Sequence, residues 1–154
     1  MKQTRQKNRL WLVIPLSVIL MGLVIAFGRH SVMADWRTAS RESTGVAPDP
    51  AVTSEAVIQV YAARAYNWRG LFGVHTWVAA KPKDALAYTV YQVVGWRVYH
   101  GGGSALGIDD GVPDRRWFGS VPDVLDDLRG DGIDDVIKRL DAAARNYPFA
   151  DEYV

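Results

Sequence analysis

The longest hydrophobic stretch of the chain is an uninterrupted apolar run near its N-terminus. Leu10 to Phe27 read LWLVIPLSVILMGLVIAF, eighteen residues without a charged side chain. As a helix this run would be about 27 Å long, which is enough to cross the hydrocarbon core of a bilayer. The pattern therefore predicts a transmembrane helix, and we expect the chain to contact the lipid bilayer through it.

Charges beside this run predict its orientation. The basic head (residues 1–9) contains four cationic side chains and no acid: Lys2, Arg5, Lys7 and Arg9. The positive-inside rule places this head in the cytoplasm. We thus expect a signal anchor in the inner membrane, with the rest of the chain in the periplasm. The alternative is a secreted protein cleaved after Ala34, because Val32-Met33-Ala34 has the small-residue spacing of a signal peptidase site.

The pattern after the apolar run separates a linker from one folded domain. Residues 28–53 are rich in Ser, Thr and Arg and include the run Gly-Val-Ala-Pro-Asp-Pro. Both prolines disfavour helix at the residues before them, so this segment is predicted to be a linker. Residues 54–154 are enough for one compact core and too few for two domains.

Three β-branched and aromatic stretches follow the linker. Ala56–Arg64, Gly73–Ala80 and Tyr88–Tyr99 are each bounded by turn residues, which is typical of strands. The polar turn Lys81-Pro82-Lys83-Asp84 joins the second and third stretches, so these two are predicted to form an antiparallel hairpin. The next segment, His100–Arg116, is rich in Gly and Asp and is expected to be mostly loop with one short strand.

The C-terminal third has the pattern of helices. Ser120-Val121-Pro122-Asp123 combines a capping residue, a proline and a first-turn acid, which predicts a short helix ending at Leu128. Ile133–Asn146 has apolar residues at three- and four-residue spacing, which predicts an amphipathic helix ended by Pro148. The expected fold class is α+β: an N-terminal transmembrane helix, then a small antiparallel sheet packed with two C-terminal helices.

Composition excludes several classes of function. Beyond residue 45 the chain has eleven basic and fifteen acidic residues, a net charge of −4, which argues against nucleic-acid binding. Cysteine is absent, so disulfides, a thiol nucleophile and a thiolate metal site are excluded. The three histidines are too few and too dispersed to form a recognisable metal site. We therefore expect no metal and no cofactor.

Histidine, tryptophan and arginine supply the candidate site residues. His75 lies on a predicted strand, two positions before Trp77 and hence on the same face, where it is a candidate general base. The alternative is a core histidine bonded to a carbonyl. The tryptophans that could share an exposed groove or line an apolar pocket are Trp68, Trp77, Trp96 and Trp117. The arginines near them, Arg64, Arg69 and Arg97, could hold a carboxylate or pair with the helix acids. The alternative for the tryptophans is packing in the core.

Several motifs together give the chain a resemblance to one family. They are Ile58-Gln59-Val60-Tyr61-Ala62-Ala63-Arg64, Trp68-Arg69-Gly70, Val74-His75-Thr76-Trp77, Gly95-Trp96-Arg97, Pro113-Asp114-Arg115-Arg116-Trp117-Phe118-Gly119, Asp127-Leu128-Arg129-Gly130 and Tyr147-Pro148. With these motifs in this order, the chain resembles the uncharacterised bacterial domain of unknown function 3750 (DUF3750) from about Trp36 onward. That family carries no established activity.

The resemblance also implies a difference at the C-terminus. The family continues past the position of Tyr153 into a Trp-Pro-Gly-Pro stretch and an Asn-Ser-Asn-Thr-Phe segment, so the resemblance implies that this chain is short or truncated at Val154. A histidine followed much later by such an Asn-rich segment is similar to the residue order of permuted papain-like (NlpC/P60-type) domains.

These observations lead to two functional hypotheses. The first is a non-catalytic, membrane-anchored envelope domain that acts in binding or assembly, with a protein or cell-envelope ligand that the sequence does not identify. The second is a partial or degenerate papain-like acyl-transfer or hydrolase domain with His75 as the base.

Overall fold

The computed structural model describes residues 14–22, 35–101 and 103–153. Residues 14–22 are helical, while the rest of the predicted transmembrane segment Leu10–Phe27, the basic head and Ala34 lie outside the described residues. Within those three ranges, no helix has both the length and the apolar character needed to cross a membrane. The chain divides into two compact units, residues 1–38 and residues 39–154.

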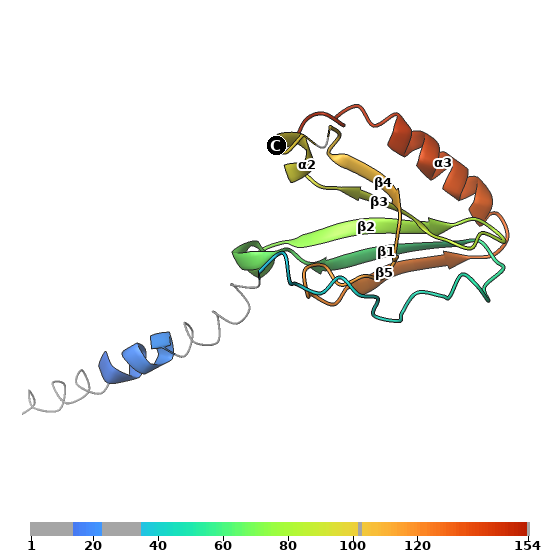
Figure 1. The fold of residues 1–154 in the computed structure, drawn as a ribbon. Helices are drawn as coiled ribbons and strands as arrows, with labels where there is room; N and C mark the ends of the chain where they lie inside the picture. The colour runs from blue at the N-terminus through green and yellow to red at the C-terminus, as the bar shows by residue number, and fades with distance from the viewer. Residues whose placement is uncertain (1–13, 23–34, 102, 154) are drawn as a thin grey trace, which may run out of the picture. The chain divides into compact units, whose positions relative to one another are not determined.

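The second unit is built on a five-stranded antiparallel sheet (Figure 1). Its strands lie in the order β4-β3-β2-β1-β5. Their bounds are β1 Val57–Arg64, β2 Val74–Lys81, β3 Thr89–Val93, β4 Leu106–Asp110 and β5 Asp123–Arg129. Two short helices, η1 (Asn67–Leu71) and α2 (Trp96–Tyr99), interrupt the connections. The predicted α+β class with an antiparallel sheet is confirmed.

Helix α3 (Ile133–Arg145) covers one face of the sheet (Figure 1). It begins after Gly132, whose φ of 83° lies in the left-handed region, and it has acids in its first turn and Arg145 in its last, as the helix dipole favours. Its apolar stripe packs through Ile137 onto side chains of β1 and β3, including Ile58 and Tyr91. The predicted amphipathic helix is therefore confirmed to within one residue.

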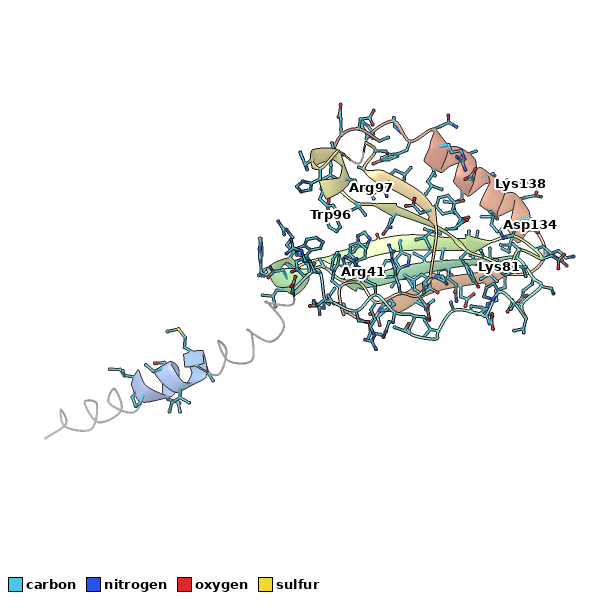
Figure 2. All side chains as sticks on the ribbon, viewed as in Figure 1. Arg41, Lys81, Trp96, Arg97, Asp134 and Lys138 are labelled. Carbon is cyan, nitrogen blue, oxygen red and sulfur yellow. The ribbon has the colours of Figure 1, made fainter. Side chains whose placement is uncertain are left out.

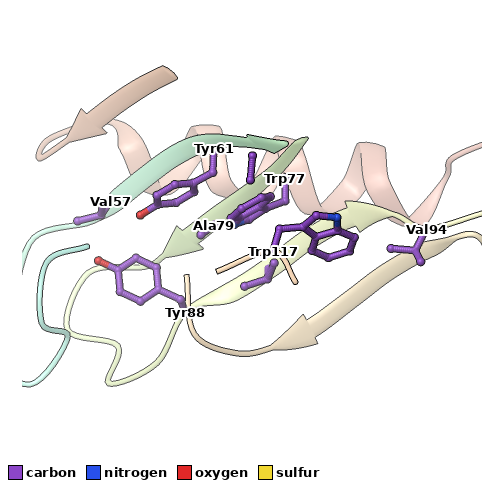
Figure 3. Packing of buried hydrophobic residues seen from close by; sticks show 9 residues of the cluster. Val57, Tyr61, Trp77, Ala79, Tyr88, Val94 and Trp117 are labelled. Atoms are coloured by element: carbon purple, nitrogen blue, oxygen red, sulfur yellow. The ribbon is translucent and has the colours of Figure 1, made fainter. Parts of the chain in front are cut away.

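The opposite face of the sheet has an aromatic core (Figure 3). Tyr61 and Trp77 face each other across β1 and β2, with ring centroids 5.4 Å apart. Figure 3 shows Trp117 lying over this face, with α3 on the far side of the sheet. The cover consists of two segments without regular helix or strand, residues 39–50 and 111–122, instead of a second helix.

The buried carboxylate of Asp114 joins these two segments. Only 1% of Asp114 is exposed, and its side chain accepts hydrogen bonds from the hydroxyl of Ser43 at 2.8 Å and the backbone N–H of Val46 at 2.8 Å. Further donors are the hydroxyl of Thr44 and the N–H of Ala47. Part of the segment that we predicted as linker thus packs on the sheet, and the compact unit begins at Ala39.

The predicted helix from Pro122 to Leu128 is wrong, because this stretch forms strand β5. Both faces of β1 are largely buried, and pairing with β5 satisfies its second edge. Buried Gln59 adds a side-chain contact, donating from Nε2 to the carboxylate of Asp127 at 2.8 Å. These tertiary contacts outweigh the local capping signal. Only one of the two predicted C-terminal helices therefore exists among the described residues.

The third predicted strand, Tyr88–Tyr99, is too long. Strand β3 ends at Val93, and after Gly95 the chain turns into α2. From Gly95 the backbone is right-handed helical (φ −58°, ψ −35°), and the N–H groups of Arg97 and Val98 donate back to Val94 and Gly95 instead of to a neighbouring strand. Because the chain leaves the sheet here, Trp96 and Arg97 are carried on a helical turn instead of alternating across a strand.

Candidate functional site

A cavity of about 330 Å³ opens beside the aromatic core, at the end of the sheet where β3 passes into α2. We call it the arginine cavity. Its lining residues come from three stretches of the chain: Arg41, Gln92, Val94, Trp96, Arg97, Arg115, Arg116, Trp117 and Phe118. Figure 2 shows Arg41, Trp96 and Arg97 toward one end of the sheet, whereas Lys81 lies toward the other.

Strand β4 positions Arg97. Its guanidinium lies over Gly107, where an added Cβ would stand 2.7 Å from Nη1. The same Nη1 donates to Asp109 at 3.2 Å in an ion pair that is partly exposed. Because residue 107 is a glycine, the guanidinium of Arg97 can lie directly over β4. Other N–H groups of the five-donor guanidinium are available to a ligand.

The loop 111–122 supplies two more arginines. Arg115 Nη2 donates to Gln92 Oε1 at 3.0 Å, which ties the loop to β3. Arg116 Nη1 donates to the carbonyl of Gly119 at 3.4 Å. Phe118 follows with a φ of 48°, and the Arg41 guanidinium lies 4.6 Å from the centre of its ring. The cavity thus combines guanidinium groups with aromatic faces.

Electrostatics in the cavity favour an anion. Burial lowers the pKa of Arg115, and the positive charge of Arg41 lowers it further, with Asp109 partly opposing. Like charges gathered at one cavity repel, and a bound anion would relieve this repulsion. Four arginines gather at this cavity although the domain as a whole is acidic. Residues 39–154 hold twelve basic and sixteen acidic residues, a net charge of −4.

Tryptophan rings form the apolar wall of the cavity. Trp96 stacks on Trp117 with ring centroids 5.9 Å apart and an interplanar angle of 26°. Trp117 is buried, while Trp96 is 47% exposed. Phe118 meets both rings edge to face. The exposed part of Trp96 offers a flat surface on which a ring or sugar could stack next to the arginines.

His75 packs against the Trp117 side of this wall. Its ring stacks on Trp117 at 3.6 Å, and its Nε2 lies 3.2 Å from Gln92 Oε1. Because Arg115 can only donate, Gln92 presents its oxygen, and His75 Nε2 must carry the hydrogen of that contact. In the neutral ring Nδ1 is then left as an acceptor.

The environment of His75 keeps it uncharged. Burial lowers its pKa below the usual value and the positive charge of Arg115 lowers it further, while the hydrogen bond to Gln92 opposes the shift. The lowered pKa favours the neutral form of the ring. Among the described residues no hydroxyl is hydrogen-bonded to His75, and cysteine is absent from the chain. A nucleophile for this base is not found in the described part of the chain.

The structure brings together only some of the residues chosen from sequence. Trp96 and Arg97 line the arginine cavity, whereas His75 stacks on Trp117 and lines a separate cavity of about 550 Å³. Trp77 is only 2% exposed and donates from Nε1 to the carbonyl of Pro113 at 2.7 Å, so it is a core residue. Arg69 lies in η1 over the ring of Trp68, outside the cavity lining.

Sequence reasoning missed six of the lining residues. Those not chosen as candidates are Arg41, Gln92, Val94, Arg115, Arg116 and Phe118. One usable signal was present: two adjacent arginines precede two adjacent aromatics in Arg115-Arg116-Trp117-Phe118, in a segment expected to be mostly loop. Loops on a rigid scaffold often carry binding residues.

Comparison with known proteins identifies the family. The family described as "Protein of unknown function (DUF3750)" matches residues 55–154. The chain belongs to this family, as the sequence motifs predicted. No curated protein and no solved structure matches the chain.

Proposed function

We propose that this member of the DUF3750 family is a non-catalytic envelope domain that binds an anionic ligand in the arginine cavity and is held at the membrane by Leu10–Phe27. One observation carries the binding proposal: four arginines and the partly exposed Trp96 line the same cavity. The membrane proposal is supported by the uncharged run of eighteen residues and the basic head before it.

The chemistry of the lining favours a ligand with two parts. A planar guanidinium pairs with a carboxylate or phosphate through two parallel hydrogen bonds. The ring of Trp96 offers stacking to a flat or apolar group beside that charge. A carboxylate joined to a ring satisfies both features, so benzoate is a suitable probe, and benzamide is its neutral counterpart of the same shape.

Benzoate is expected to bind the full-length chain in detergent micelles with a dissociation constant of about 1 mM, which corresponds to about 4 kcal/mol. Arg97→Met should weaken this binding at least about tenfold, because it removes charged hydrogen bonds worth roughly 1.5–3 kcal/mol. The Arg97–Asp109 ion pair is partly exposed, so its loss should leave the fold intact. Isothermal titration calorimetry measures the affinity.

Two controls make this test specific. Arg139→Met removes a cation from the exposed surface of α3, and its benzoate affinity should equal that of the wild-type chain. Benzamide should bind the wild-type chain at least about tenfold more weakly than benzoate, because it lacks the charge. Equal binding of benzoate and benzamide, or equal loss of affinity in both arginine variants, would contradict an anion site at the arginine cavity.

A second candidate function is the acyl-transfer or hydrolase activity with His75 as base. The contact that favours it is the pairing of His75 with Gln92 on the neighbouring strand, which leaves Nδ1 able to accept a proton from water. Against it stand the stack on Trp117, which covers one face of the ring, and the lack of a hydroxyl bonded to His75 among the described residues.

Hydrolysis of p-nitrophenyl acetate separates the two candidates. If His75 acts as a base, His75→Gln should lower the rate at least about a hundredfold, as loss of a general base typically does. His100→Gln, at an exposed histidine outside the arginine cavity, is the matched control. The binding proposal predicts the same rate for both variants and for the wild-type chain.

A further inference from the structure

The connection between β1 and β2 carries an exposed apolar surface that the arginine cavity does not use. We call residues 65–74 the β1–β2 tip, and Figure 1 shows it as the green coil at one end of the sheet. Three of its large side chains are exposed: Trp68 (54%), Leu71 (64%) and Phe72 (86%). Exposed apolar clusters of this kind mark interaction sites in folded proteins.

The β1–β2 tip has a fixed shape. The backbone N–H groups of Phe72 and Gly73 both donate to the carbonyl of Arg69, and the N–H of Ala65 donates to Gly73. An added Cβ at Gly70 would lie 2.3 Å from the carbonyl oxygen of Ala65, so only glycine fits there. The apolar side chains are therefore presented to solvent by an ordered turn.

Charge at the β1–β2 tip is positive. Between Glu55 and Asp84 the chain contains no acidic residue, although residues 39–154 as a whole are acidic. Arg64 donates from Nη1 to the carbonyl of Gly70 at 3.1 Å, and the Arg69 guanidinium lies 5.3 Å from the centre of the Trp68 ring. An apolar, aromatic surface bordered by arginines fits the interface of an anionic bilayer.

The β1–β2 tip also lies close to the point where the chain enters the domain. The carbonyl of Ser40 accepts a hydrogen bond from Gly119, and the neighbouring Phe118 packs on Tyr66 with ring centroids 4.9 Å apart. Residues 28–38, between the proposed anchor and the domain, extend to at most about 40 Å. This covalent link keeps the β1–β2 tip within reach of any membrane that holds Leu10–Phe27.

We infer that the β1–β2 tip inserts Trp68, Leu71 and Phe72 into the interface of an anionic phospholipid bilayer, with Arg64 and Arg69 against the lipid phosphates. This inference rests on the proposed membrane anchor. It gives the domain a second contact with the membrane, which limits its orientation and fixes how the neighbouring arginine cavity faces the bilayer.

The absence of cysteine from the chain permits a direct test. Phe72→Cys and Leu86→Cys each provide one thiol at a highly exposed apolar position, and Leu86 lies on the β2–β3 connection at the opposite end of the sheet. Each full-length variant is labelled with the same environment-sensitive fluorophore. It is then reconstituted into vesicles of phosphatidylcholine and phosphatidylglycerol with brominated acyl chains, and insertion is checked by flotation.

We expect the brominated chains to quench the fluorescence of the label at position 72 several-fold more strongly than that of the label at position 86. Adding the Arg69→Glu substitution, or omitting phosphatidylglycerol, should decrease the quenching at position 72. If the chain floats with the vesicles but both labels are quenched equally or not at all, the inference is overturned and the anchor proposal stands. If the chain does not float, the anchor proposal fails and the inference fails with it.

Discussion

Replacing Trp117 with alanine is expected to lower the free energy of unfolding by about 3–5 kcal/mol, which is the typical cost of truncating a large buried aromatic side chain to alanine. Trp117 is 7% exposed. Its ring centroid lies 3.6 Å from that of His75, 5.9 Å from that of Trp96 and 5.0 Å from that of Phe118. It comes from a loop, so no regular element would fill the space that its removal leaves. Since small domains are stable by only about 5–15 kcal/mol, this single change should leave a marginal fold.

Urea denaturation followed by circular dichroism measures this loss. Trp68→Ala is the matched control, because Trp68 is 54% exposed on the β1–β2 tip and its removal should change the free energy of unfolding by less than about 1 kcal/mol. Equal destabilisation by the two variants would show that Trp117 is not the centre of the aromatic core.

Asp114→Ala is expected to lower the free energy of unfolding by about 3 kcal/mol, because it removes the charged acceptor of several hydrogen bonds at once. The donors in Ser43, Val46 and Ala47 belong to the N-terminal covering segment, which should detach first. Hydrogen exchange should show lost protection at the amides of Val46 and Ala47. Asp110→Ala, at an exposed acid of the same region, should leave both amides protected.

The contribution of Asp114 should also depend on pH. Burial alone would raise its pKa, but hydrogen bonds from Ser43, Val46 and Ala47 outweigh burial and hold the pKa below its usual value. A carboxyl whose folded pKa is depressed stabilises the fold fully above its unfolded pKa of about 3.9 and loses this effect as the pH falls through the folded value. The difference between wild type and Asp114→Ala should therefore stay constant from about pH 7 to 5 and shrink below about pH 4.

Prediction from sequence succeeded where one local pattern agreed with the packing. The β-branched and aromatic composition of β1 and β2 and the helical spacing of α3 are local signals, and each agrees with the side chains that the element buries. It failed at β5, all of whose residues are exposed, because the reason for that strand is the unsatisfied edge of β1 far away in the chain. It failed again after Val93, because the apolar stretch continues to Tyr99 and carries no local signal that the chain leaves the strand for the helical turn α2.

The candidate site was predicted in part for a related reason. Trp96 and Arg97 were found because an aromatic and a cation stand side by side in sequence. Arg41 and Arg115 were missed because the linker and loop that carry them have no periodicity, and tertiary hydrogen bonds such as those of Asp114 and Gln92 hold these segments in place. Trp77 was chosen for its residue type, but its position opposite Tyr61 places it in the core.

The central claim is that the arginine cavity binds an anion beside Trp96. A nitrogen–proton correlation spectrum of the six indole groups, assigned by single Trp→Phe variants and recorded during a benzoate titration, tests it most directly. We predict saturable shifts of the Trp96 and Trp117 signals, little change at exposed Trp68, and no saturable shift with benzamide. Equal shifts of Trp68 and Trp96, or the same response to both probes, would contradict the claim.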